Sequence, residues 1–256
     1  MALPEVLRAT EREAVVWSRL WRSSVFSTVV APVLLLVAMG IGLGGLVDAD
    51  PSELDGLDYI DFIAPGLLVA TAVQSASGGS LWPVMAGHKW LGFHHAMVSS
   101  PLSPVDVFGG QVIWQSTRSM LGAAVFLLAS VALGAVSSWS GLLAVPVAGL
   151  TAMAFAAPLA AFAATQDSDA KFDVIIRMGV VPLYLFSGTL FPVDQLPLGL
   201  RLVTAVFPLW HGVELARGAT TGTLEAADLG HLAVVVAYIA FGWWWGARTF
   251  TRRLTA

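Results

Sequence analysis

Apolar segments of about the length needed to cross a membrane follow one another along almost the whole chain, and the charged residues lie in short clusters between them. Only 12% of the 256 residues are charged. A soluble domain carries about 25%. A spanning helix needs about 20 mostly apolar residues, so a chain of this length has room for six spans joined by short loops. We therefore expect a single all-α integral membrane domain over residues 1–256.

The apolar runs place these spans at 25–46, 62–82, 107–134, 141–164, 174–191 and 230–248. Residues 2–22 fit an amphipathic helix with an apolar face (Leu3, Leu7, Ala14, Trp17 and Trp21) opposite a charged one (Glu5, Arg8, Arg12, Arg19 and Arg22). Trp and Arg arranged in this way favour a helix that lies in the membrane interface over residues 1–22. The alternative is a solvated leader helix.

Basic residues predict the orientation. The first loop, 47–61, contains acidic residues and no Lys or Arg. If the N-terminus is inside, eleven of the thirteen basic residues lie at cytoplasmic positions or just inside span ends, and only Arg201 and Arg217 fall outside. Basic residues are retained on the cytoplasmic side during insertion, so we expect both termini to be cytoplasmic.

Two connections are too apolar to be simple loops. Residues 83–106, on the inside, combine aromatic and basic residues and end in a Ser-Ser-Pro-Leu-Ser-Pro run, which predicts a short helix at the membrane surface. Residues 192–229, on the outside, are interrupted by Pro192, Pro197 and Pro208. Because a proline breaks a continuous helix, we expect short helices that form a re-entrant hairpin in the outer leaflet.

The strongest motif lies at the start of this outer connection. Residues 186–197 read FSGTLFPVDQLP, and residues 207–211 read FPLWH, followed by Arg217. This motif resembles the signature of type-2 ABC export permeases, and within them the NodJ-type branch that exports nodulation factors, which are lipo-oligosaccharides. The order of the expected elements is similar along the whole chain. One difference is that many members carry Glu where His95 stands here.

The resemblance implies a bacterial inner-membrane permease that pairs with a second copy or a close relative. It also implies a separate ABC ATPase subunit that binds ATP and magnesium and drives export of an amphipathic substrate such as a lipo-oligosaccharide, a glycolipid or a drug. The residues agree on one point. Gly78-Gly79 and Gly109-Gly110 lack the Lys and Ser/Thr of a phosphate-binding loop. We therefore expect a transport subunit without enzyme activity or cofactor of its own, in contact with lipid and not with nucleic acid.

The inner loop is the candidate surface for coupling to the ATPase, because a short helix with exposed aromatic side chains needs a groove that buries them. The alternative is a helix that rests on lipid headgroups. Adjacent histidines point about 100° apart on a helix, so we expect no metal site in this chain. The coupling candidates are His88, Lys89, Trp90, Phe93, His94, His95, Met97, Ser100 and Pro101.

Polar residues inside the spans form further candidates. Gln111, Gln115 and Arg118 share one face of the third span and are candidates for a polar cytoplasmic entrance, the alternative being pairing with a neighbouring helix or snorkelling of Arg118. Small and polar residues of the second span, among them Gln74 and Ser77, suit either helix packing or a substrate or dimer surface. On the fifth span, the candidates for an apolar path are Phe186, Leu190 and Phe191.

Two other classes of polytopic membrane protein are alternatives for this sequence. A rhomboid-type intramembrane serine protease needs a Gly-x-Ser-Gly turn and a histidine within reach of the serine, but Leu185 stands where Ser187-Gly188 would need its first glycine. A secondary transporter without an ATPase is expected to carry coupling carboxylates in the middle of the membrane, and the sequence shows none that is well centred. Both remain alternatives to the export permease.

Overall fold

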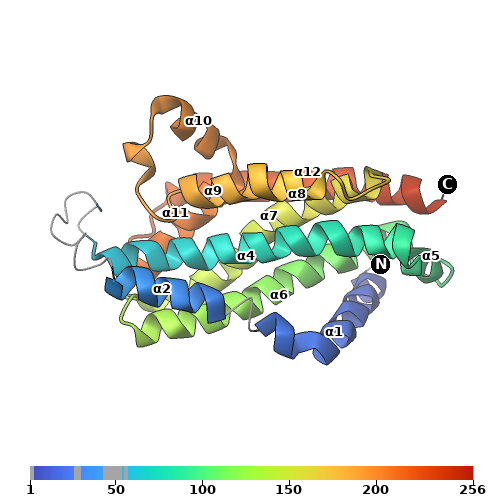
Figure 1. Cartoon of the computed structure of the whole chain (residues 1–256), viewed down its shortest axis with the longest axis horizontal. Coiled ribbons are helices and arrows are strands. Elements are labelled where there is room, and N and C mark those ends of the chain that lie inside the picture. The colour runs from blue at the N-terminus through green and yellow to red at the C-terminus, as the bar shows by residue number, and fades with distance from the viewer. Residues whose placement is uncertain (1–2, 26–29, 43–53, 55–56, 256) are drawn as a thin grey trace.

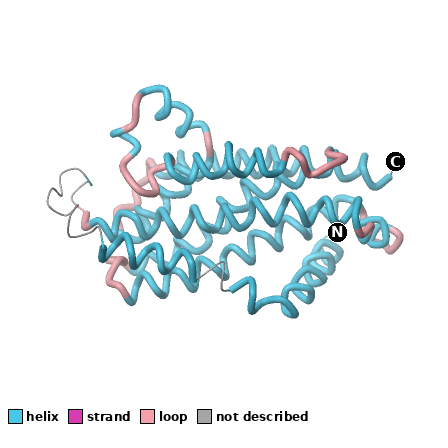
Figure 2. Tube along the Cα trace, viewed as in Figure 1, coloured by secondary structure: helices cyan, strands magenta, loops and turns pink. Residues whose placement is uncertain are grey.

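The computed structural model describes residues 3–25, 30–42, 54 and 57–255, and the regular elements among them are all helical (Figures 1 and 2). This confirms the expected all-α class. The longer helices are α1 (Leu3–Val25), α2 (Ala31–Gly42), α4 (Tyr59–Met85), α6 (Pro104–Ala132), α7 (Ala144–Thr165), α10 (Leu198–Val206), α11 (Pro208–Thr221) and α12 (Asp228–Thr255). The shorter ones are α5 (Phe93–Val98), α8 (Phe172–Val174), α9 (Val181–Phe186), the π-helical segments η3 (Ala86–Trp90) and η5 (Ile175–Val180), and the 3-10 turns η4 (Trp139–Leu143) and η6 (Val193–Gln195).

Four helices in the described part of the chain are long and apolar enough to cross a membrane. They are α4 with η3, α6, η4 with α7, and α12, and they correspond to the second, third, fourth and sixth expected spans. In Figure 1 they lie side by side along the long axis. One end of this bundle carries α5 and the C-terminus and is called the α5 end here; the other carries α10 and α11 and is called the α10 end.

Helix α7 lies at the centre of the bundle, because it contacts α4, α6, α11 and α12. Its buried face consists largely of alanine, from Ala144 to Ala164. Small side chains let helix backbones approach closely, which is how helices associate where both protein and lipid are apolar. The partner helices also approach closely: a Cβ at Gly242 of α12 would lie 2.7 Å from Ala157 Cβ, so only glycine fits at that contact.

The first and fifth expected spans are shorter than predicted in the described residues. Within 25–46, α2 covers Ala31–Gly42, and residues 26–29 and 43–46 lie outside the described residues. Within 174–191, one helix made of α8, η5 and α9 runs from Phe172 to Phe186, short of the roughly 20 residues of a full span. It ends there because Gly188 turns the chain with a φ of 74°.

Prolines divide the connection at the α10 end as expected. Pro192 precedes η6, Pro197 precedes α10 and Pro208 is the first residue of α11, so no continuous helix forms. Helix α11 packs against α4, α7 and α12. By contrast, α10 stands away from the bundle (Figure 1) and exposes apolar side chains, among them Leu198 and Leu202.

Helix α1 confirms the predicted N-terminal helix, whose apolar face was expected to lie in the membrane interface. It lies obliquely across the α5 end (Figure 1) and contacts α6. Ala9 is buried against Gly110 of α6, and the Trp17 ring meets the Trp114 ring edge-on at 6.0 Å. Leu7, placed on the apolar face by sequence, stays 55% exposed. The contact with Gly109 and Gly110 thus uses a face of α1 other than that of Leu7, which the bundle leaves uncovered.

Candidate functional site

The connection between α4 and α6 (residues 86–103) forms a folded cap at the α5 end. Helix α4 continues through η3 to Trp90, and Gly92 reverses the chain with a φ of 67° before α5 begins. At the other side, Ser103 caps α6: its hydroxyl accepts from the Asp106 N–H, and its own N–H donates to the Asp106 carboxylate at 2.9 Å. This capping box explains why the Ser-Pro run ends the short helix and starts the next.

His94 anchors this connection to the bundle. Its side chain is buried, and its ring centroid lies 4.7 Å from that of Phe93 and 5.8 Å from that of Phe250 on α12. Gly87 leaves room for it, because a Cβ there would lie 2.2 Å from His94 Cε1. Burial, followed by the nearby charges of His88 and Arg12, lowers the pKa of His94 to about 3. His94 is thus a neutral packing residue at physiological pH, and His95 beside it faces solvent.

The remaining coupling candidates divide into exposed and buried groups. Trp90 is 52% exposed, and Leu91, which the sequence analysis did not single out, is 75% exposed. Phe93 is only half-buried by the bundle, but the Arg12 guanidinium covers its ring at 3.8 Å from the centroid. Met97 packs against the core. Lys89, His95, Ser100 and Pro101 are exposed, and His88 is buried.

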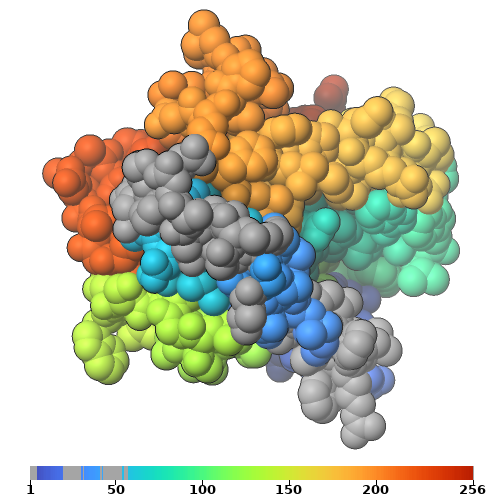
Figure 3. Space-filling model, turned by 60° about the vertical axis from the view of Figure 1, so that its left-hand side comes forward, coloured from blue at the N-terminus to red at the C-terminus, as the bar shows by residue number. Residues whose placement is uncertain are grey.

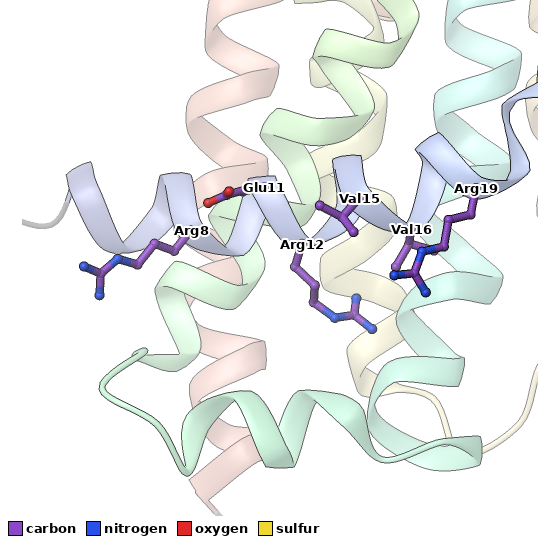
Figure 4. Close-up of a pocket in the computed structure, with 6 residues that line it drawn as sticks. All are labelled: Arg8, Glu11, Arg12, Val15, Val16 and Arg19. Carbon is purple, nitrogen blue, oxygen red and sulfur yellow. The ribbon is translucent and has the colours of Figure 1, made fainter.

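Arg12 therefore joins α1 to α5. A hollow of about 600 Å³ lies beside it. Figure 4 shows the side chains of Arg12 and Arg19 extending from α1 on the side of the α4–α6 connection. The hollow combines charged and apolar side chains of α1, mostly basic ones among the charged, namely Arg8, Glu11, Arg12, Val15, Val16 and Arg19. The two surface candidates found from sequence, the amphipathic helix and the inner loop, are thus one continuous surface.

A second hollow lies at the α5 end between η3, α7 and α12. It measures about 520 Å³ and is lined by basic and hydroxyl side chains: His88, His95, Thr165, Thr249, Arg252 and Arg253. The adjoining α7–α8 turn is held in place by two cations, since Lys89 donates to the Asp167 carbonyl and Arg253 pairs with the Asp167 carboxylate at 2.8 Å. The surface next to Trp90 therefore combines the basic residues of this hollow with the acidic turn around Asp167.

The polar candidates inside the bundle have different roles. The amides of Gln111 and Gln115 both donate to the Gly79 carbonyl of α4, at 3.2 and 2.9 Å, so they bind α6 to α4. Ser77 is fully buried and donates to the Val73 carbonyl of its own helix, so it lines no surface. Arg118 lies at the midpoint of α6, deeper than the entrance proposed from sequence, and shares a cavity with Gln74.

At the α10 end, the FSGTLFP segment is packed tightly on α4. Ser187 and Thr189 are fully buried, and a Cβ at Gly66 of α4 would lie 2.8 Å from the Thr189 backbone. The rings of Phe186 and Phe191 meet edge-on at 6.2 Å, and Leu190 packs against the core. In the described part of the chain, the Ser187 hydroxyl has no hydrogen-bond partner, so no described histidine is positioned to activate it.

Arg217 organises this end, a role that the sequence analysis did not assign. Its guanidinium donates to the Gly188 carbonyl, pairs with Glu214 at 2.7 Å and lies 3.9 Å from the Phe62 ring centroid. It thereby links α11, the signature turn and the start of α4. Arg217 follows Gly188 by 29 residues, so this contact could be recognised only once the fold was known. His211 is also placed inward, with Nε2 2.9 Å from the Ala205 carbonyl oxygen and Nδ1 2.8 Å from His231 Nδ1.

The chain is similar to known proteins over nearly its whole length. The sequence profile of a family described as ABC-2 type transporter matches residues 5–220. Proteins named nodulation protein J from Rhizobium leguminosarum bv. viciae and from Rhizobium meliloti (strain 1021) are 27% and 25% identical to it. These matches cover 97% and 95% of this chain and 94% and 91% of the relatives. Because the family profile matches most of the chain, including the α1–α5 surface and the signature turn, the protein belongs to the ABC-2 type transporter family.

Proposed function

We propose that this chain is the permease subunit of an ATP-driven exporter in a bacterial inner membrane. The family membership carries this proposal, because the match extends from the N-terminal helix through α11. In this arrangement the four long helices, the helix Phe172–Phe186 and the segment around α2 make six spans. Helix α1 lies in the inner interface, and η6, α10 and α11 form the re-entrant hairpin in the outer leaflet. Both termini are cytoplasmic.

The energy source is a separate ABC ATPase. No Gly-x-x-x-x-Gly-Lys-Ser/Thr loop occurs in the sequence. The two glycine pairs that come nearest to it serve helix packing instead: Gly79 faces Gln115, and Gly110 faces Ala9. The ATPase docks at the α5 end, where Trp90 and Leu91 are exposed next to a basic hollow. We propose an apolar groove with an acidic rim as the complementary surface on the ATPase.

The cargo is an amphipathic molecule, and the resemblance to the nodulation-factor branch favours a lipo-oligosaccharide or a related glycolipid. Two permease copies, or one copy and a close relative, enclose its path.

Purification of the chain alone and with its ATPase tests this function. Alone, the chain should hydrolyse no ATP, because it has no phosphate-binding loop. Co-expressed with the ATPase encoded next to it, it should co-purify as a complex whose ATP hydrolysis is stimulated by the lipo-oligosaccharide. Hydrolysis by the isolated chain at a transporter-like rate, or failure of any ABC ATPase to associate, would contradict the proposal.

The proposed orientation predicts which end of the bundle an impermeant reagent reaches. The sequence contains no cysteine, so His95→Cys at the α5 end and Thr223→Cys at the α10 end can each be labelled alone. Both positions are exposed. In intact spheroplasts, an impermeant maleimide should label position 223 and not position 95, and permeabilisation should make both reactive. Labelling of position 95 before permeabilisation would reverse the orientation.

A further inference from the structure

A polar cavity opens at the side of the bundle, between α2, α4 and α6. It measures about 300 Å³ and is lined by Pro32, Thr71, Gln74, Ser75, Gly78, Gly79 and Arg118. The three helices contact one another around it. Figure 3 views this side of the molecule, where α2 (blue) lies over α4 (cyan) and beside α6 (yellow-green).

The depth of Arg118 makes this cavity unusual. Fourteen residues of α6 precede Arg118 and fourteen follow it, which places it about 21 Å from either end of the helix. A long basic side chain near a helix end can extend to the membrane surface, but one at the midpoint cannot reach it. An arginine held near the middle of a bilayer costs about 3 kcal/mol or more unless it is paired.

No anionic group offsets this charge in the described part of the chain. The cavity lining contains no Asp or Glu, and no hydrogen bond or ion pair is recorded for the guanidinium among the described residues. Residues 26–29 and 43–47, which adjoin α2, contain no acidic residue either. The polar residues of α6 on the preceding turns are Gln111 and Gln115. Both are uncharged, and their amide N–H₂ groups donate to the Gly79 carbonyl.

The remaining groups around the cavity suit an anion. Gln74 is exposed and supplies an amide N–H₂, Ser75 supplies a hydroxyl, and Arg118 supplies a planar fork of N–H donors. Gly78 leaves the space open, because nothing lies within 4 Å of a Cβ built there. A guanidinium fork matches the oxygen atoms of phosphate, sulfate or carboxylate in a bidentate manner.

We propose that this cavity binds the anionic group of an amphipathic molecule midway across the membrane. The depth argues for an anion attached to an apolar chain. A free anion would lose its hydration in the middle of the membrane and has no apolar chain whose burial would offset that cost. The inference deepens the proposed function, because it gives the exported molecule a phosphate, sulfate or carboxylate that Arg118, Gln74 and Ser75 hold during its passage.

Binding of decyl phosphate to the purified chain tests this site without the ATPase. The wild-type chain in a neutral detergent should bind decyl phosphate at least tenfold more tightly than decyl maltoside, which has the same apolar chain and no charge. Arg118→Gln should remove this preference, and Arg118→Lys should keep most of it. The matched control is Arg177→Gln, which removes an exposed arginine from the helix Phe172–Phe186 and should leave binding unchanged.

Two further measurements test the role of Arg118. The melting temperature separates ligand binding from a purely structural role of its charge, and competition by inorganic phosphate separates a lipid-borne anion from a free one. If Arg118 serves only packing, Arg118→Gln should lower the melting temperature, whereas a ligand site predicts an unchanged or higher value in the absence of ligand. Inorganic phosphate at millimolar concentration should not displace decyl phosphate; displacement would overturn the lipid-borne source. Equal binding of the phosphate and the maltoside would overturn the site itself. The proposed function would stay intact if the same chain still associated with the ATPase and exported its cargo in intact cells.

Discussion

Replacing Trp90 and Leu91 together by alanine is expected to abolish ATPase association and export while leaving the amount of permease in the membrane unchanged. Both side chains are exposed at the tip of η3, outside the packed core, so their loss should not affect folding. Truncation of a buried anchor in an interface costs about 2 kcal/mol or more, which corresponds to about 30-fold in affinity. The measurement is the ATPase co-purified per permease in membranes from the same cells.

The opposite end of the molecule offers a matched control. Trp139 and Leu142 form the same pair of residue types and are even more exposed, at 92% and 66%. Their double alanine variant removes the same apolar area at the α10 end and should retain ATPase binding. Equal loss in both variants would mean that apolar truncation reduces assembly in general. Undiminished co-purification of the Trp90/Leu91 variant would move the coupling surface to α1 and its hollow around Arg12 and Val15.

Arg217→Leu is expected to lower the free energy of unfolding by about 2 kcal/mol, because it removes a buried guanidinium that serves a partly exposed carboxylate and a backbone carbonyl. The substitution leaves Glu214 without its partner and the Gly188 carbonyl without its donor. The signature turn should then detach from α4, so export should fall together with stability. Thermal unfolding in detergent and export by intact cells are the two measurements.

Arg201→Leu is the control for this substitution. Arg201 lies in the same connection and pairs with Asp194, but both side chains are largely exposed. An exposed ion pair contributes about 0–1 kcal/mol, so this variant should unfold close to the wild-type temperature. If Arg217→Leu were equally mild, the guanidinium would not hold the turn, and close packing of Gly66 on Thr189 would have to do so alone.

Hydropathy and local rules predicted much of the helical framework. The four long helices lie where the second, third, fourth and sixth spans were expected, and the amphipathic N-terminal helix forms over Leu3–Val25. Pro192, Pro197 and Pro208 divide the connection at the α10 end as their missing N–H groups require. The FPVDQLP motif indicated the family, which the match over residues 5–220 confirms.

The contacts of individual side chains could not be predicted in the same way. Trp90 and Phe93 look alike in the sequence, yet Arg12 of another helix covers Phe93, and the reversal at Gly92 leaves Leu91 exposed. Ser77 and Gln74 lie one turn apart on α4, yet one is fully buried and the other lines a cavity. A helical period shows which residues share a face, but not which neighbour covers that face.

The sequence by itself determined the all-α class, the positions of the long helices and the family, because a lipid environment demands long apolar helices and prolines end them locally. Only the tertiary structure decided that Arg118 meets Gln74 in one cavity, that His94 is buried beneath Gly87 and that Arg217 holds the signature turn. Each of these contacts joins residues from different elements. They depend on how closely glycine and alanine let the helices approach, which is a property of packed pairs of helices and not of any one segment.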